Sequence, residues 1–371
     1  MNRRQFLRHS VVYGASIALG NLSSCAKTPK ASVDDRSLFK IMKIIDAHAH
    51  PDVHPDVYPS STPDLREVDN TSTLKAMKEL GMVASSFAAV GDLVFLTQGR
   101  LRDSEFKITM VQLEWWVNRL AKSAKVKLVL KASDVPNIIE PNDPPGAILA
   151  IEGGDPLEGN PDRVNEFYNF GVRMITLVHG RNNELGDLMR KWRGVDPGPM
   201  NNGLTSAGRK VVGRMQDLGM VIDVAHAHPT TLKQISEMSS RPLVDSHTSP
   251  CPNEDPTKCG RLRTWKDMEL VAKTDGVVCT WPLAYQWGAV TRNTFRDWAK
   301  EILEMKKRLG MDHVGLGTDG GGHMPKLING YRDIRDLVRL MSAMQDVGFS
   351  NNEIAAYMGG NFCRVLQRCI S

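Results

Sequence analysis

Six side chains of the kinds that bind transition metals follow short apolar segments of the chain. In His48-Ala49-His50 the two imidazoles lie two residues apart, so on a strand they point to the same side and can reach one cation. Neutral imidazoles with one or two carboxylates suit zinc and other divalent transition metals. The full set has more ligands than one open tetrahedral site uses. It predicts two divalent ions, expected to be zinc, that share a carboxylate bridge. Two such ions would lower the pKa of a water bound between them. The candidate metal ligands are His48, His50, Glu152, His226, His247 and Asp319.

The prediction depends on the joint placement of these residues, because each one has an ordinary structural explanation. A single histidine at a strand end is more often simply hydrogen-bonded to its surroundings, and His-x-His matches many sequences by chance. We expect Asp46 to orient its neighbours, and His228, which precedes Pro229, to serve a helix start. The coincidence of several such residues with strand ends is the signal for a metal centre.

Eight short apolar segments alternate with helix-like stretches along the chain. Nearly continuous apolar runs are typical of parallel strands that are buried on both faces. The expected strands are residues 42–46, 82–89, 147–151, 172–178, 220–225, 242–245, 276–281 and 314–317. The expected helices are residues 74–80, 110–122, 205–218, 230–238, 265–272, 298–309, 334–344, 351–358 and 362–366.

This alternation predicts an α/β fold, a (β/α)8 TIM-type barrel over residues 41–371. A doubly wound open sheet is the competing architecture, but neither G-x-G-x-x-G nor G-x-x-x-x-G-K-[ST] follows the first expected strand. In a barrel, catalytic groups come from the carboxyl ends of several strands. The candidate metal ligands fall at these ends.

Residues 1–24 are expected to be an export signal rather than part of the fold. Arg3 and Arg4, followed by Phe6-Leu7, resemble a twin-arginine signal. The apolar run at 11–22 is shorter than the ~20 residues that span a bilayer. Leu22-Ser23-Ser24-Cys25 resembles a bacterial lipobox, which implies lipidation of Cys25, with residues 25–40 as a tether. We therefore expect a protein of the bacterial cell envelope, on its periplasmic or extracellular face, whose N-terminal lipid alone contacts the membrane; ordinary export with cleavage elsewhere is the alternative.

Composition and charge exclude several protein classes. Hydrophobic residues make up 41% and charged residues 24%, which is typical of a globular protein and not of a disordered, fibrous or polytopic membrane chain. The net charge of +5 is too small for a nucleic-acid-binding surface on a chain of 371 residues. None of the six cysteines forms a C-x-x-C pair, which excludes a zinc ribbon. Export would permit a Cys251–Cys259 disulfide, although spacing alone leaves the pairing open.

The chain resembles the membrane dipeptidase (renal dipeptidase) family of the metal-dependent amidohydrolase superfamily. The likeness runs in the family's order from about residue 42 to residue 367. Its most specific parts lie in the fifth and sixth strand segments and near the C-terminus. The segments that carry it are Ile45-Asp46-Ala47-His48, Ile151-Glu152-Gly153-Gly154, Ile175-Thr176-Leu177-Val178-His179, Gly203-Leu204-Thr205-Ser206-Ala207-Gly208, Val221-Ile222-Asp223-Val224-Ala225-His226, Asp245-Ser246-His247-Thr248-Ser249, Val314-Gly315-Leu316-Gly317-Thr318-Asp319 and Gly359-Gly360-Asn361-Phe362-Cys363-Arg364-Val365.

The resemblance implies an amidohydrolase-like barrel and a role for each matching residue. His48 would bind the first metal, Glu152 would bridge both metals, and His226 and His247 would bind the second. Asp319 would lie beside the first metal and carry a proton from the attacking water to the leaving amine.

Two further residues are implied to contact substrate. His179 would steady the oxyanion of the tetrahedral intermediate, and Arg263 would bind the terminal carboxylate of a dipeptide, although Arg261 lies close by. A homodimer would fit the family.

The chain also departs from the family's pattern. His50 stands where the family has an aspartate, and Gly321 stands where a second aspartate is frequent. The loop at 51–69 and the aromatic stretch at 281–287 do not match. The leading hypothesis is a metal-dependent dipeptidase that hydrolyses the amide bond of dipeptides. The alternatives are a related amidohydrolase acting on another amide, an N-acyl amino acid or a lactone, and a lipoprotein that binds metal or ligand without catalysis.

Overall fold

The computed structural model describes residues 42–54, 74–97, 100–137, 143–189, 200–252, 259–322 and 324–370. The expected export signal, Cys25 and the tether lie outside these ranges, so they stay predictions. Among the helices of the described ranges, none has the length and apolar character that crossing a bilayer requires.

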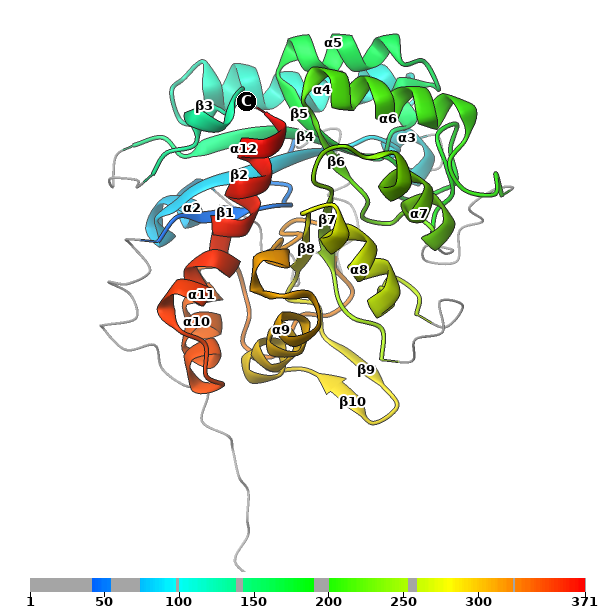
Figure 1. Ribbon diagram of the computed structural model, residues 1–371. Coiled ribbons are helices and arrows are strands. Elements are labelled where there is room, and N and C mark those ends of the chain that lie inside the picture. Colours follow the sequence, from blue (N-terminus) through cyan, green and yellow to red (C-terminus); the bar gives the residue numbers. More distant parts are fainter. Residues whose placement is uncertain are drawn as a thin grey trace, which may run out of the picture.

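Eight parallel strands form a nearly closed barrel, which confirms the expected TIM-type fold over the open sheet (Figure 1). Ala47, directly after the first strand, donates its N–H to Leu316 O of the last strand at 3.0 Å, and Ala49 forms a β-bridge with Gly320. Each predicted strand segment overlaps one barrel strand, and β2, β4 and β7 extend beyond the predicted bounds. In barrel order they are β1 (Ile44–Asp46), β2 (Met82–Val90), β4 (Gly146–Glu152), β5 (Val172–Thr176), β6 (Val221–Asp223), β7 (Val244–Thr248), β8 (Val277–Thr280) and β11 (Val314–Leu316).

Helices surround the barrel, and one short strand and one hairpin are added to it (Figure 1). β3 (Lys127–Leu128) pairs with β4, and β9 (Tyr285–Trp287) with β10 (Val290–Arg292) forms an antiparallel hairpin. Several helices begin at a threonine or serine whose hydroxyl accepts a backbone N–H of the first turn, as Thr205 and Ser350 do. The helices are α2 (Leu74–Leu80), α3 (Leu93–Leu96), α4 (Glu105–Trp116), α5 (Asp162–Phe170), α6 (Ser206–Leu218), α7 (Pro229–Met238), α8 (Trp265–Lys273), α9 (Phe295–Leu309), α10 (Leu337–Asp346), α11 (Asn351–Ala355) and α12 (Asn361–Cys369), with π-helical turns at Val117–Ala121 and Ala356–Gly360.

The two faces of the strands enter different apolar clusters. In β4, Leu149 and Ile151 pack in the layer between strands and helices, whereas Ile148 and Ala150 point into the barrel. Glu152 follows with the same parity as Ile148 and Ala150, so it points inward at the carboxyl end of the strand.

The barrel interior is closed at its other end by α12. Phe362 and Leu366 of this helix share a buried cluster with Val221 and Val277, the first residues of β6 and β8. Apolar side chains thus fill the amino end of the barrel, and the carboxyl end is left for polar groups.

Candidate metal centre and active site

Glu152 lies between two pairs of histidines at the carboxyl end of the barrel. Its Oε1 is 3.4 Å from Nε2 of His48, 3.0 Å from Nε2 of His226 and 3.4 Å from Nε2 of His247, and its Oε2 is 3.4 Å from Nε2 of His50. All five residues are buried. One carboxylate therefore contacts a pair that follows β1, and a second pair of which His226 follows β6 and His247 lies in β7.

Asp319 completes the cluster on the side of the first pair. Its Oδ1 is 3.9 Å from Nε2 of His48 and 3.6 Å from Nε2 of His50. Its backbone N–H donates to His48 O at 2.9 Å, which ties the end of β11 to the end of β1. Asp319 and His226 both have positive φ, 51° and 64°, a conformation that non-glycine residues rarely adopt and that is typical of functional sites. A side chain at Gly322 would collide with the carboxylate of Asp319.

Hydrogen bonds behind the histidines orient their rings toward the cluster. Nδ1 of His50 is 2.7 Å from Ala88 O, so it carries a proton and the Nε2 atom is the one that faces the cluster. Ser246 Oγ donates to Asp223 at 2.6 Å and so accepts from Nδ1 of His247 at 2.9 Å. Asp46 accepts the backbone N–H of His48 at 3.2 Å, which agrees with the orienting role expected for it.

The donor set fits divalent metal ions. Nε2 atoms approach one another to 3.3 Å between His48 and His50, and to 3.1 Å between His226 and His247. Lone pairs directed at each other at this distance repel unless a cation or a proton lies between them. Nδ1 of His226 is buried without a hydrogen-bond partner in the described structure. The six predicted ligands thus come together as overlapping groups that each suit a metal ion.

The electrostatics of the cluster also favour a cation. Although burial alone would raise the pKa of Glu152, the imidazoles of His179 and His48 hold it well below its usual range. Burial lowers the pKa of His226 and His247 well below the ordinary value, so both are neutral, as metal ligands must be. At His50, burial opposes protonation, but Asp319 and Glu152 raise the pKa to about 10. The site of His50 therefore strongly favours positive charge.

His179, which follows β5, flanks the cluster. Its Nε2 is 3.7 Å from Oε2 of Glu152, and its ring meets that of His226 edge-on at 4.7 Å. Its Nδ1 is 2.8 Å from Oδ1 of Asp92. Burial alone would lower the pKa of His179, but the charges of Glu152 and Asp92 raise it to about 9. Sequence reasoning missed Asp92, whose only signal was an acidic residue just after the second strand.

Arg263 does not lie where the resemblance placed it. Its side chain is fully buried, Nε donates to Asp245 Oδ2 at 2.7 Å, and the two terminal nitrogens donate to Ala227 O and Val224 O. The guanidinium therefore links the side chain of Asp245 in β7 to the two backbone carbonyls that follow β6. We correct the expectation of a substrate contact to a structural role, since its guanidinium is enclosed by protein.

Arg261 lies on the metal side of the same segment. Its Nη2 donates to His247 O at 2.8 Å, and its guanidinium stands 5.2 Å from the ring of Trp281. Nε of Arg261 is buried without a hydrogen-bond partner in the described structure. Trp281, from the aromatic stretch that sequence reasoning could not place, packs 5.3 Å from the ring of His247. Burial lowers the pKa of Arg261, although the negative charges of Asp245, Asp319 and Glu152 act to raise it.

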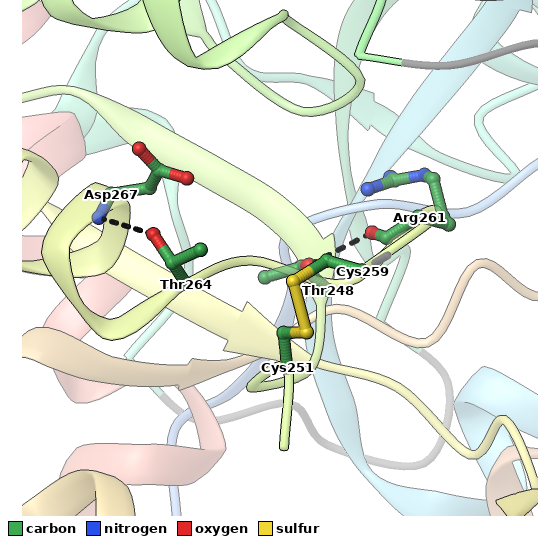
Figure 2. Close-up of a disulfide and its surroundings, with 6 residues drawn as sticks. All are labelled: Thr248, Cys251, Cys259, Arg261, Thr264 and Asp267. Carbon is green, nitrogen blue, oxygen red and sulfur yellow. Dashed lines mark hydrogen bonds between the residues drawn. A yellow bond between two sulfur atoms is a disulfide. The ribbon is translucent and has the colours of Figure 1, made fainter. Parts of the chain in front are cut away.

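A disulfide joins Cys251 and Cys259 at the base of the Arg261 segment (Figure 2). The bridge was permitted by the sequence and is present. Cys251 donates its N–H to Arg263 O at 2.6 Å, and Thr248 Oγ1 donates to Arg261 O at 3.4 Å. The segment that carries both arginines is thus fastened to the end of β7 by covalent and hydrogen bonds.

Comparison with known proteins places this geometry in a family. The family model described as membrane dipeptidase (peptidase family M19) matches residues 34–370. Dipeptidase tcpJ of Claviceps purpurea is 26% identical over 248 residues, which are 66% of this chain and 56% of that protein. The chain spans about half the length of the curated relatives it matches.

Solved structures share the fold. The probable dipeptidase PvdM of Pseudomonas aeruginosa has a TM-score of 0.73 at 16% identity and covers 91% of this chain and 97% of its own. A metallopeptidase of Rhodobacter sphaeroides, liganded with a phosphinate mimic of L-Ala-D-Ala, has a TM-score of 0.69 at 20% identity and covers 89% and 99%. Because the family model matches nearly the whole folded chain, the protein belongs to the membrane dipeptidase family, peptidase family M19.

Proposed function

We propose that this protein is a metal-dependent dipeptidase with two divalent ions, zinc being expected. The observation that carries the proposal is Glu152, which contacts two separate histidine pairs while Asp319 and His179 flank them. Membership of the M19 family supports it, and so does the dipeptide mimic bound to the Rhodobacter sphaeroides neighbour.

Peptide hydrolysis needs a proton carrier, a donor to the oxyanion and a site with limited access to solvent, and the chain's own residues supply these three beside the metal ions. Bound divalent ions would polarise the amide carbonyl and lower the pKa of water. Asp319, at the edge of the cluster, takes a proton from the attacking water and gives it to the leaving amine. Nε2 of His179 faces the cluster and donates to the oxygen that gains charge in the transition state. The closed apolar barrel beneath the site keeps solvent on one side only.

Recognition of the substrate's carboxylate is assigned to Arg261. A guanidinium is suited to bind a free carboxylate through two parallel hydrogen bonds. Arg261 has a buried donor without a protein partner and lies beside His247, whereas the donors of Arg263 are directed at Asp245 and backbone carbonyls. Because Arg261 lies beside His247, a peptide whose terminal carboxylate binds to Arg261 must be very short for its amide bond to lie at the cluster.

The first test is metal content by elemental analysis together with hydrolysis of a dipeptide panel by the chain that starts after Cys25. We expect about two zinc ions per chain and turnover of dipeptides. Turnover of N-acyl amino acids or lactones without dipeptide cleavage would assign the alternative amidohydrolase activity, and the non-matching Trp281 segment beside His247 favours this as second candidate. Metal binding without turnover of any amide would leave a binding protein.

We also propose that Cys25 is lipidated and holds the protein to the cell envelope after twin-arginine export. Radiolabelled palmitate should enter the wild-type chain and not a Cys25→Ala variant, which should become soluble in the periplasm. The possible homodimer is tested by light scattering on the same soluble chain.

A further inference from the structure

Asp92 holds the turn that carries His179 at two points. It follows β2 by one residue and is fully buried. Its Oδ1 is 2.8 Å from Nδ1 of His179, and its Oδ2 accepts the backbone N–H of Gly180 at 2.7 Å. One carboxylate therefore fixes both the ring and the backbone beside it.

The surroundings leave Asp92 little freedom. Gly91 donates its N–H to Glu152 O at 2.7 Å, which sets Asp92 beside the strand end that bears the central carboxylate. A Cβ at Gly180 would stand 2.6 Å from Oδ2 of Asp92, so the close approach depends on a glycine at that position. Arg181, which lies two residues after His179, donates to Asp155 at 2.6 Å. The charge of Asp92 is thus directed at His179 and the Gly180 amide.

We propose that Asp92 is a positioning residue for His179, an inference that rests on the proposed hydrolase function. A carboxylate accepts and cannot donate when ionised, so Nδ1 of His179 carries a proton toward Asp92, and Nε2 donates to the oxyanion when the ring is protonated on both nitrogens. It also fixes the plane of the ring, with Nε2 directed toward Glu152 and the cluster. Without Asp92, the ring would rotate and exchange tautomers, and its Nε2 would meet the developing oxyanion less often.

The kinetic test uses Asp92→Asn, His179→Ala and the double variant in the metal-loaded full chain. Outer hydrogen-bond partners of this kind are worth about 10- to 100-fold in activity. We expect Asp92→Asn to lower kcat by about that factor, with KM within about threefold of wild type because the role belongs to the transition state. In the His179→Ala background the same substitution should change kcat by less than about twofold, since two residues that act as one unit are not additive.

A second readout does not depend on turnover. The ¹⁵N chemical shifts of His179, assigned by their loss in His179→Ala, should show Nδ1 protonated in wild type and exchanging tautomers in Asp92→Asn. If dipeptides are not hydrolysed, these shifts still decide the inference, so its failure is separable from failure of the proposed function.

Asp187→Asn is the matched control. Asp187 is also fully buried, and its carboxylate is also bound at two points, by the backbone N–H groups of Asn201 at 2.7 Å and Gly203 at 2.6 Å. Its effect on kcat should be the same with and without His179. The inference is overturned if Asp92→Asn is equally damaging in both backgrounds, or if the His179 shifts are unchanged by that substitution.

Discussion

Arg261 and Arg263, separated by one leucine, send their guanidinium groups to opposite sides of the end of β7. Arg261 donates to His247 O beside the metal cluster, whereas Arg263 is paired with Asp245 at 2.7 Å on the far side. The disulfide and the bond from Thr248 to Arg261 fix this segment (Figure 2), and Arg263 also donates its N–H to Ser249 O at 2.9 Å. The two arginines therefore allow substrate binding and structural support to be tested separately.

Substitution of Arg261 should weaken binding of substrates that have a free carboxylate. Removing one member of a desolvated charge pair costs about 2–5 kcal/mol, so Arg261→Met should lower kcat/KM for dipeptides by about 30-fold or more. The control is the matching dipeptide amide, which lacks the carboxylate and should be hydrolysed at nearly equal rates by wild type and variant. An equal loss on both substrates would contradict the assignment.

Substitution of Arg263 should act on stability instead. Arg263→Met leaves the buried carboxylate of Asp245 without its cation, which typically costs about 3–5 kcal/mol of unfolding free energy. Urea denaturation measures this loss. Arg335→Met, which removes an exposed pair with Asp333, should cost less than about 1 kcal/mol. If both variants were equally stable, the structural role of Arg263 would be wrong.

Asp319→Asn should separate metal binding from proton transfer. The amide keeps the size of the side chain and one acceptor oxygen, so metal content by elemental analysis should stay close to wild type. Turnover should fall by about 10²- to 10⁴-fold, because the amide cannot take the proton of the attacking water. A fully active variant would exclude Asp319 as the proton carrier.

Glu152→Gln should abolish metal binding and activity, as removal of the metal from wild type should abolish activity. The carboxylate contacts both histidine pairs, so its replacement should remove metal and activity together. A chelator should lower the melting temperature of wild type, because metal bound only to the folded state stabilises it. The same chelator should hardly change the melting temperature of Glu152→Gln. A large shift in that variant would show that the bridge is not needed for binding.

Glu105 should make stability depend on pH near neutrality. It accepts the N–H groups of Val94 and Phe95, both at 2.9 Å, and burial, with the charges of Asp155 and Asp92, raises its pKa from 4.5 to about 7. Between these two values the folded state binds more protons than the unfolded state, so its contribution is present below the lower value and is lost as pH rises through the upper one.

The measurement is the free energy of unfolding in urea between about pH 5 and about pH 8, for wild type and Glu105→Gln. Because the glutamine does not titrate, the stability of wild type relative to the variant should decrease with rising pH across this interval. Parallel curves for the two proteins would refute the prediction. Other titrating groups are common to both proteins and cancel in the difference.

The barrel could be predicted because its strands are buried on both faces, which makes each one an unbroken apolar run. The polar helix α5 was missed because only Val164 and Phe167 of its nine residues are buried, too few to show a helical period. The β9–β10 hairpin was missed because its residues are mostly exposed or half-buried, so no apolar run marks them. The burial pattern of an element, rather than the secondary-structure propensity of its residues, therefore determined whether it could be predicted from the sequence.

The clustering of the six candidate metal ligands could be predicted because they lie near the carboxyl ends of strands whose positions were already indicated by the apolar runs. The roles of Arg261 and Arg263 could not be distinguished in this way, because they depend on which of the two guanidinium groups reaches the side chain of Asp245 in β7. Asp92 belongs to no motif, and its partner His179 is 87 residues away. Such pairings between loops arise from the closed barrel and leave no local pattern in the sequence.

The seam between β1 and β11 has a consequence for how the protein is made. His48 and Asp319 meet across that seam, and Asp46 is bound to Thr318 over a separation of 272 residues. Contacts so distant along the chain form slowly and late in folding. A chain still emerging from the ribosome, or one cut short before residue 319, holds His48 and His50 without Asp319, one of their two acidic partners. The proposed hydrolytic activity would therefore arise only in molecules whose synthesis has passed the final strand, and incomplete chains would lack the complete cluster.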